Sequence, residues 1–277
     1  MANTVQPDYS TVTELPGARA SSQQWARLLH RYHFAALHAA GRDVLEAGCG
    51  AGLGLGWLSC TAKNVVGGDY TAPHLQIAYR HYNGRVPLLQ FDAAALPFQD
   101  HSFDLVVLFE ALYYLDRPIQ FLAECARVLR PGGMVLIGTV NREWRDFHPS
   151  PFARKYYSAT ELRELLTGSG FSPEIFGAFR STTWSARGRA FSWLKRTASR
   201  SGLIPRTMRG KETLKRVFFG PLEILPAEII PNGGRYLPPH ALNAGGVPCD
   251  YTVLYALGRL PGEAAEAAER ETDVASS

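Results

Sequence analysis

The sequence predicts an α/β domain in which a parallel sheet is covered by helices on both faces. Two observations lead to this prediction. Short apolar runs alternate with segments of helical periodicity, and several glycines lie close together in the turn after the first run. The predicted strands span Asp43–Ala47, Asn64–Gly68, Val86–Phe91, Phe103–Phe109 and Met134–Val140. A chain of 277 residues, 46% of them hydrophobic, has enough apolar content for one such domain with an insertion.

The remaining elements follow from periodicity and turn signals. Helices are predicted over Gln23–Ala40, Pro73–Tyr82, Pro118–Leu129 and Ala159–Gly170. Thr160 is the expected N-cap of the last of these helices. Two further strands are predicted over Pro173–Phe179 and Tyr251–Leu257. The chain therefore divides into an N-terminal helical cover (1–40), an α/β core (41–180), an insertion (181–246), a final core strand (247–260) and a helical or disordered tail (261–277).

Charge and cysteine usage narrow the class of protein. The net charge is +4, and ten of the basic residues lie between Ser181 and Arg216 beside a single acid, Glu212. This basic segment either forms a solvated helix or favours an anionic partner. The four cysteines show no metal-ligand spacing, so no metal site is predicted. Since no leading apolar segment and no run of eighteen apolar residues occurs, we expect a cytoplasmic protein.

The turn after the first strand carries the clearest chemical signal. In Val44–Gly52 a buried strand leads into glycines at positions 48, 50 and 52, where only glycine lets backbone and ligand approach closely. A nicotinamide or flavin site would require Gly-x-Gly-x-x-Gly, and none of the three glycines starts that spacing. S-adenosylmethionine (SAM) has no pyrophosphate and needs only a tight turn beside its methionine part. The pattern therefore favours SAM.

Two aspartates follow the next strands. Asp69 lies 21 positions after Gly48, where a carboxylate can accept hydrogen bonds from both hydroxyls of a ribose. Its alternative role is to cap the helix beginning near Pro73. Asp92 follows the third strand, where it can accept a hydrogen bond from the adenine amino group. The carboxyl ends of parallel strands meet at one edge of the sheet, so these groups are predicted to converge there.

Several sequence blocks together resemble the small-molecule class I SAM-dependent methyltransferases of the ubiquinone/menaquinone type. The blocks are Val44–Gly52, Val65–Tyr70, Phe91–Asp92 with Leu96–Phe98, Ser102–Asp104 and Val128–Gly133, in the family's order. The resemblance covers residues 40 to 180 and implies a Rossmann-like seven-stranded sheet, with Glu46 orienting the methionine end and Phe109 lining the pocket. The expected cofactor site comprises Glu46, Gly48, Cys49, Gly50, Gly52, Asp69, Tyr70, Asp92, Ala93 and Phe109.

The expected reaction is methyl transfer to a small molecule, with oxygen of a secondary metabolite, sugar or quinone-like compound as the leading acceptor. His148 is the first candidate for a general base because an imidazole can accept a proton at neutral pH, followed by Tyr113 and Glu110. The insertion is predicted to cover the acceptor side, and its basic residues favour an anionic or glycan-like acceptor. Two alternatives remain open: a nucleic-acid methyltransferase that uses residues 187–216, and a non-catalytic SAM-binding module. The expected partners include no nucleic acid, and the sequence leaves the oligomeric state open.

Overall fold

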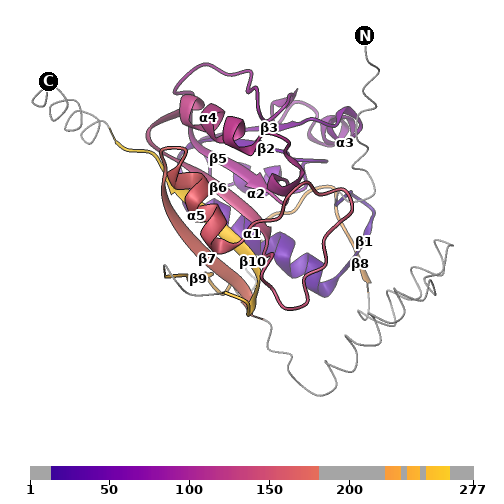
Figure 1. Cartoon of the computed structure of the whole chain (residues 1–277). Coiled ribbons are helices and arrows are strands. Elements are labelled where there is room, and N and C mark those ends of the chain that lie inside the picture. Colours follow the sequence, from indigo (N-terminus) through magenta and orange to yellow (C-terminus); the bar gives the residue numbers. More distant parts are fainter. Residues whose placement is uncertain (1–13, 181–221, 232–235, 244–247, 263–277) are drawn as a thin grey trace, which may run out of the picture.

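The apolar runs form neighbouring strands of one sheet. The computed structural model describes residues 14–180, 222–231, 236–243 and 248–262. The sheet has the strand order β4-β3-β2-β5-β6-β10-β7-β9 (Figure 1). Its strands are β2 (Asp43–Ala47), β3 (Asn64–Asp69), β4 (Leu88–Gln90), β5 (Phe103–Phe109), β6 (Leu129–Val140), β7 (Ser172–Arg180), β9 (His240–Ala241) and β10 (Tyr251–Arg259). The predicted Rossmann-like α/β sheet is confirmed, with the short strand β9 added at one edge.

Strand direction determines where a ligand can bind. Strands β4, β3, β2, β5 and β6 run parallel, whereas β10 lies antiparallel between β6 and β7. The chain builds outward from β2 to β3 and β4, then returns to place β5 on the other side of β2. In open α/β sheets such a reversal leaves a crevice at the carboxyl ends of the strands. The crevice here lies at the ends of β2 and β5.

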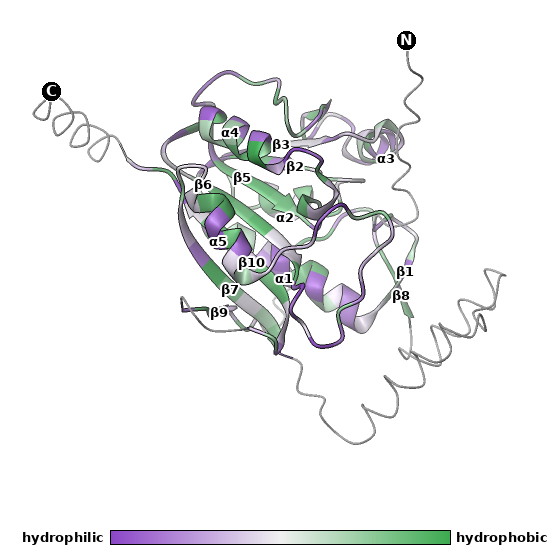
Figure 2. Ribbon diagram, viewed as in Figure 1, coloured by the Kyte–Doolittle hydropathy of each residue, from purple (hydrophilic) through white to green (hydrophobic). Residues whose placement is uncertain are grey.

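Helices cover both faces of the sheet, and each face has its own core. One cluster of buried side chains joins α1 (Ser22–Ala39), α2 (Leu55–Ser59) and α3 (Ala72–Tyr82) to the sheet. The other cluster joins α4 (Pro118–Val128) and α5 (Ala159–Thr167) to the opposite face. Figure 2 shows hydrophobic residues over much of β5 and β6 between these helices. This double cover explains why the central strands read as continuous apolar runs.

Capping boxes start two of the helices. Ser21 Oγ accepts a hydrogen bond from Gln24 N at 3.2 Å, and the Gln24 side chain accepts one from Ser21 N at 3.0 Å. At α5 the N-cap is Ser158, so the prediction of Thr160 was wrong. Ser158 and Glu161 have the spacing of a reciprocal capping box, which places the N-cap two residues before Thr160, while the helix begins at Ala159 as predicted.

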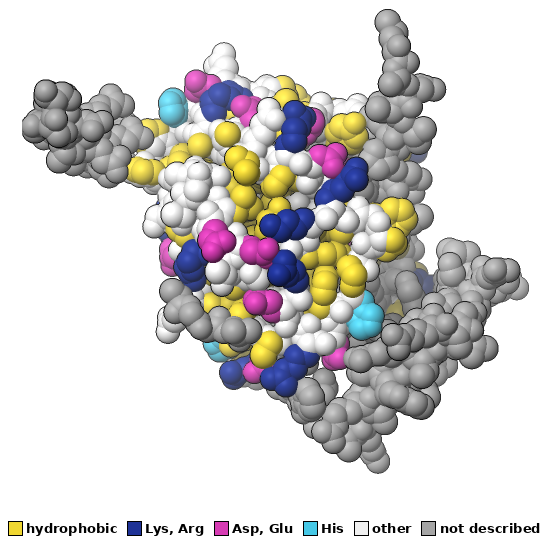
Figure 3. Space-filling view, viewed as in Figure 1, with side chains coloured by type: hydrophobic (Ala, Val, Ile, Leu, Met, Phe, Trp, Pro, Cys, Tyr) yellow, Lys and Arg dark blue, Asp and Glu magenta, His cyan; other side chains and the backbone are white. Residues whose placement is uncertain are grey.

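A small second sheet pairs a strand from the N-terminal part of the chain with a strand from the insertion (181–246). Strand β1 (Arg19–Ser21) pairs antiparallel with β8 (Leu222–Ile224), beside the start of α1. The basic segment 187–216 lies outside the described residues. On the face shown in Figure 3, acidic and basic side chains of the described part are interspersed. The described residues include no helix with both the length and the apolar character needed to span a bilayer.

Candidate active site

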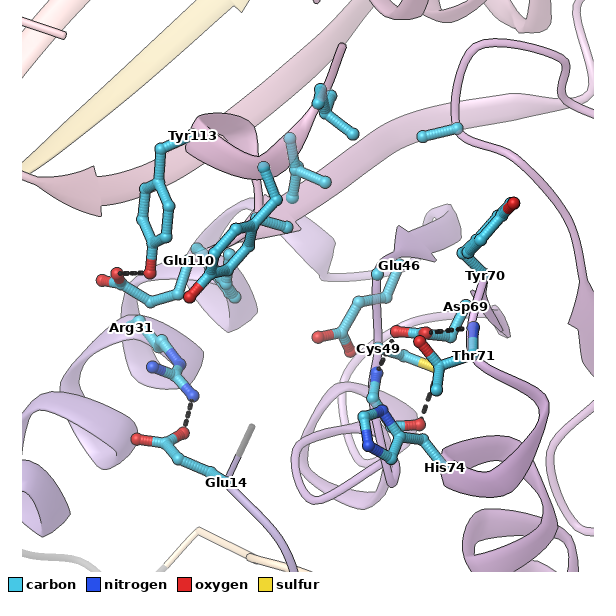
Figure 4. Close-up of a pocket in the computed structure, with 18 of the residues that line it drawn as sticks. Glu14, Arg31, Glu46, Cys49, Asp69, Tyr70, Thr71, His74, Glu110 and Tyr113 are labelled. Atoms are coloured by element: carbon cyan, nitrogen blue, oxygen red, sulfur yellow. Dashed lines mark hydrogen bonds and ion pairs between the residues drawn. The ribbon is translucent and has the colours of Figure 1, made fainter. Parts of the chain in front are cut away.

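A cavity of about 480 Å³ opens at the carboxyl ends of β2, β3, β4 and β5, beneath α1. Its wall includes every residue predicted for the cofactor site except Gly52, and it also includes Glu110 and Tyr113. Figure 4 shows these side chains in two groups, with Glu46, Cys49 and Asp69 in one and Glu110, Tyr113 and Arg31 in the other. The topology of the sheet thus brings together predicted site residues that lie up to 67 positions apart in the chain, from Glu46 to Tyr113.

The glycine turn requires left-handed backbone at alternate positions. Gly48, Gly50 and Gly52 have φ values of 72°, 57° and 78°, which side chains disfavour. Gly48 and Gly50 face the cavity. Gly52 instead packs against Tyr82 of α3, whose hydroxyl donates to Gly52 O at 2.7 Å. The first two glycines therefore border the ligand space, and the third shapes the turn.

Asp69 joins the end of β3 to the glycine turn. Its Oδ2 accepts a hydrogen bond from Gly50 N at 2.8 Å, and its Oδ1 accepts one from Thr71 N at 2.7 Å (Figure 4). The N-cap position of α3 is occupied by Thr71, so Asp69 is not that helix's cap residue. Each carboxylate oxygen has a second lone pair available. The side chain can therefore hold the turn and still accept hydrogen bonds from a ligand diol.

Asp92 lines the same cavity from the loop after β4. Its Oδ1 accepts from Ala94 N at 2.8 Å, and its Oδ2 forms a 2.9 Å ion pair with Arg117, which follows β5. The Asp92 side chain is 43% exposed, and the neighbouring residues Tyr70 and Ala93 also line the cavity. This part of the cavity wall is therefore partly open to solvent.

Glu46 is the most buried acid of the cavity. Its residue is 1% exposed, and its Oε1 accepts a hydrogen bond from the Tyr32 hydroxyl at 2.5 Å. Among the described residues, its Oε2 has no hydrogen-bond partner. Burial raises the pKa of Glu46 to about 7, although Tyr32 and Arg31 oppose this shift. An unpaired buried carboxylate oxygen at a cavity wall is a strong indication of a ligand donor group.

The second half of the cavity contains the catalytic candidates Glu110 and Tyr113. The Tyr113 hydroxyl donates to Glu110 Oε2 at 3.0 Å, and Glu110 has a positive φ of 51° at the end of β5 (Figure 4). Burial raises the pKa of the Glu110 carboxyl, while Arg31 and the Tyr113 hydrogen bond lower it. His148 is exposed, and its Nδ1 lies 2.8 Å from Asp146 O rather than at the cavity. The structure brings two of the three catalytic candidates together and places the third outside.

The other side chains at the turn and sheet have structural surroundings. Burial raises the pKa of the Cys49 thiol well above its ordinary value, so Cys49 stays a neutral packing residue at physiological pH. Asp104 accepts a hydrogen bond from Asp43 N at 2.9 Å and pairs with Arg130 at 2.9 Å. These contacts lie at the opposite end of the strands from the glycine turn, consistent with a structural role for Asp104.

Helix α1 contributes polar groups that sequence reasoning missed. Arg27, Arg31 and Tyr32 all line the cavity. Arg31 is paired with Glu14, which lines the same cavity from the segment before β1 (Figure 4). Arg27 and Arg31 are four residues apart, so the sequence already indicated that they share one face of the helix. The apolar residues of the same helix predicted only that the helix packs on the domain as a cover.

Comparison with known proteins shows which proteins this chain resembles. Residues 45–137 match the model of the family described as "Methyltransferase domain". A "Probable S-adenosylmethionine-dependent methyltransferase" of Mycolicibacterium smegmatis is 40% identical over 167 residues, covering 58% of this chain and 63% of the relative. A SAM-dependent methyltransferase from Thermotoga maritima has a similar fold, with a TM-score of 0.51, 18% identity, and coverage of 86% of this chain and 95% of that one.

Two further relatives have named acceptors. A demethylmenaquinone methyltransferase of Clavibacter sepedonicus is 29% identical over 56% of this chain and 64% of its own length. A fatty-acid O-methyltransferase of Mycolicibacterium smegmatis is 39% identical over 38% of this chain and 40% of its own length. The chain thus spans less than two thirds of the curated relatives it matches. Residues 45–137 thus resemble a methyltransferase domain, and relatives that match this chain are named as S-adenosylmethionine-dependent.

Proposed function

We propose that this chain transfers the methyl group of SAM to an oxygen atom of a small-molecule acceptor. The observation that carries the proposal is the convergence of the glycine turn, Glu46, Asp69 and Asp92 on one cavity that continues to Glu110 and Tyr113. The relatives named for quinone and fatty-acid methylation support a small acceptor. A sugar or another secondary metabolite with a hydroxyl group has the same acceptor chemistry.

In this proposal the two halves of the cavity have separate tasks. Asp69 accepts hydrogen bonds from the ribose hydroxyls, and Asp92 accepts one from the adenine amino group. Gly48 and Gly50 allow the methionine part to lie against the backbone, with Phe109 as an apolar wall. Tyr70 and Ala93 border the adenine side, while Cys49 and Gly52 shape the turn. The residues of this chain thus hold the cofactor without any covalent contribution.

Glu110 is the proposed proton acceptor. The acceptor oxygen attacks the methyl carbon, the carbon–sulfur bond breaks, and its electron pair stays on sulfur, which loses its positive charge. The acceptor's hydroxyl proton passes to the Glu110 carboxylate, which Tyr113 holds by its hydrogen bond. The remainder of the rate enhancement comes from alignment of the two reactants in a site shielded from water. His148 remains a prediction for this role, but its place outside the cavity favours Glu110.

The test measures formation of S-adenosylhomocysteine (SAH) with quinol, hydroxylated fatty-acid and sugar acceptors. For the acceptor that reacts, Glu110→Gln should lower turnover by roughly a hundredfold or more while SAH affinity stays within about twofold. His148→Ala is the matched control and should keep full turnover. Loss of turnover in His148→Ala with normal Glu110→Gln activity would transfer the role of base to His148. SAH binding without turnover of any acceptor would favour the non-catalytic alternative.

A further inference from the structure

The surroundings of Glu46 contain a contact that has no part in the reaction described above. The groups facing this carboxyl are Tyr32 and Arg31 of α1, Cys49 of the glycine turn, Asp69 at the end of β3, and Tyr82 of α3. Among the described residues, only Tyr32 donates a hydrogen bond to it. The bond uses Oε1 and leaves Oε2 unpartnered at the cavity wall. One oxygen of Glu46 is therefore fixed by the protein, and the other is free for a ligand.

The position of Tyr32 is itself fixed by two contacts. A Cβ atom on Gly54 would lie only 1.8 Å from Tyr32 Cζ, so the ring occupies the space left by this fourth glycine of the turn. The Tyr32 and Phe109 rings meet edge to face with centroids 5.3 Å apart. The Tyr32 residue is 3% exposed. A ring held between the turn and β5 has little freedom to move its hydroxyl away from Glu46.

We propose that Tyr32 is a positioning residue for the cofactor, holding Glu46 so that Oε2 accepts a hydrogen bond from the α-ammonium group of SAM. This inference rests on the proposed function. The unpartnered oxygen requires an N–H or O–H donor, which the sulfonium centre of SAM lacks and its ammonium group supplies. A charged donor also compensates the buried negative charge of Glu46. Helix α1 therefore contributes to cofactor recognition from outside the residues that match the family.

Tyr32 also affects the charge of Glu46. Burial raises the pKa of this carboxyl to about 7, and the Tyr32 hydrogen bond opposes the shift. Loss of the hydroxyl would raise the pKa further, and a larger fraction of Glu46 would be protonated at neutral pH. A neutral carboxyl holds an ammonium group less tightly than a carboxylate does. The loss of affinity should therefore depend on pH.

The experiment compares two ligands on Tyr32→Phe by calorimetry. SAH carries the ammonium group, whereas 5′-methylthioadenosine has the same nucleoside and sulfur but no amino-acid part. Tyr32→Phe should weaken SAH binding about tenfold at pH 7 and leave methylthioadenosine within about twofold. The SAH deficit should grow toward pH 6 and shrink toward pH 8. Tyr255→Phe is the matched control, because it removes a buried hydroxyl that contacts His30 and not Glu46.

The outcomes separate this inference from the proposed function. Equal weakening of both ligands, or unchanged SAH binding at every pH, would overturn the role of Tyr32. If Tyr32→Phe fails to fold, the unmodified chain still gives a test, since its SAH affinity should rise from pH 6 to pH 8 relative to that of methylthioadenosine. Identical pH profiles would then overturn the inference. An unmodified chain that binds neither ligand would instead contradict the proposed function.

Discussion

Asp69 offers the most direct measure of the proposed cofactor site. Its carboxylate accepts two backbone hydrogen bonds, from Gly50 N at 2.8 Å and Thr71 N at 2.7 Å, and keeps one lone pair on each oxygen for the ribose. Asp69→Ala removes the proposed ribose acceptor and the hydrogen bond that connects the glycine turn to β3. A hydrogen bond to a charged group contributes about 1.5–3 kcal/mol. SAH affinity should therefore fall by about 10- to 150-fold.

The assay is calorimetric titration with SAH, beside a matched control that separates binding from folding. Asp104→Ala also removes a carboxylate that accepts a backbone hydrogen bond, from Asp43 N, and it breaks an ion pair with Arg130. Asp104 lies outside the cavity, so its substitution should leave SAH affinity within about twofold. Unchanged affinity in Asp69→Ala would refute the placement of the ribose. Equal losses in both variants would show that the effect comes from the sheet as a whole.

Two other predictions concern the charge of Glu46 and the insertion. Because the pKa of Glu46 is raised from 4.5 to about 7 in the folded chain, the folded state binds a proton more tightly than the unfolded state between these values. The free energy of unfolding of the ligand-free chain should therefore fall by about 3 kcal/mol as pH rises from about 4.5 to 7. Denaturant unfolding of Glu46→Gln should lack this component. An equal pH dependence in the unmodified chain and in Glu46→Gln would contradict this prediction. We also propose that the insertion covers the acceptor, so replacing residues 187–216 by a short Gly/Ser linker should keep SAH binding and abolish methyl transfer. Retained transfer to the same acceptor at an unchanged KM would exclude that role.

The sequence alone determined the framework of the site. The apolar runs at 43–47 and 103–109 coincide with β2 and β5, because strands buried between two layers of helices are apolar over most of their length. The glycine spacing and the position of Asp69 after the next strand placed both groups at the carboxyl edge of the sheet. These features are local patterns combined with a topology rule, so they could be predicted without coordinates.

Only the tertiary structure decided which side chains complete the cavity. Tyr32 and Arg31 belong to a helix whose periodicity indicates which face is buried, but periodicity does not identify the element that this face contacts. His148 follows β6 in a loop without periodicity, so its place outside the cavity wall had no local signal. Ser158 was the N-cap rather than Thr160 because a reciprocal pair with Glu161 fixes the helix start. Side-chain direction in loops and contacts between distant elements depend on packing of the whole chain, which spacing along the sequence does not determine.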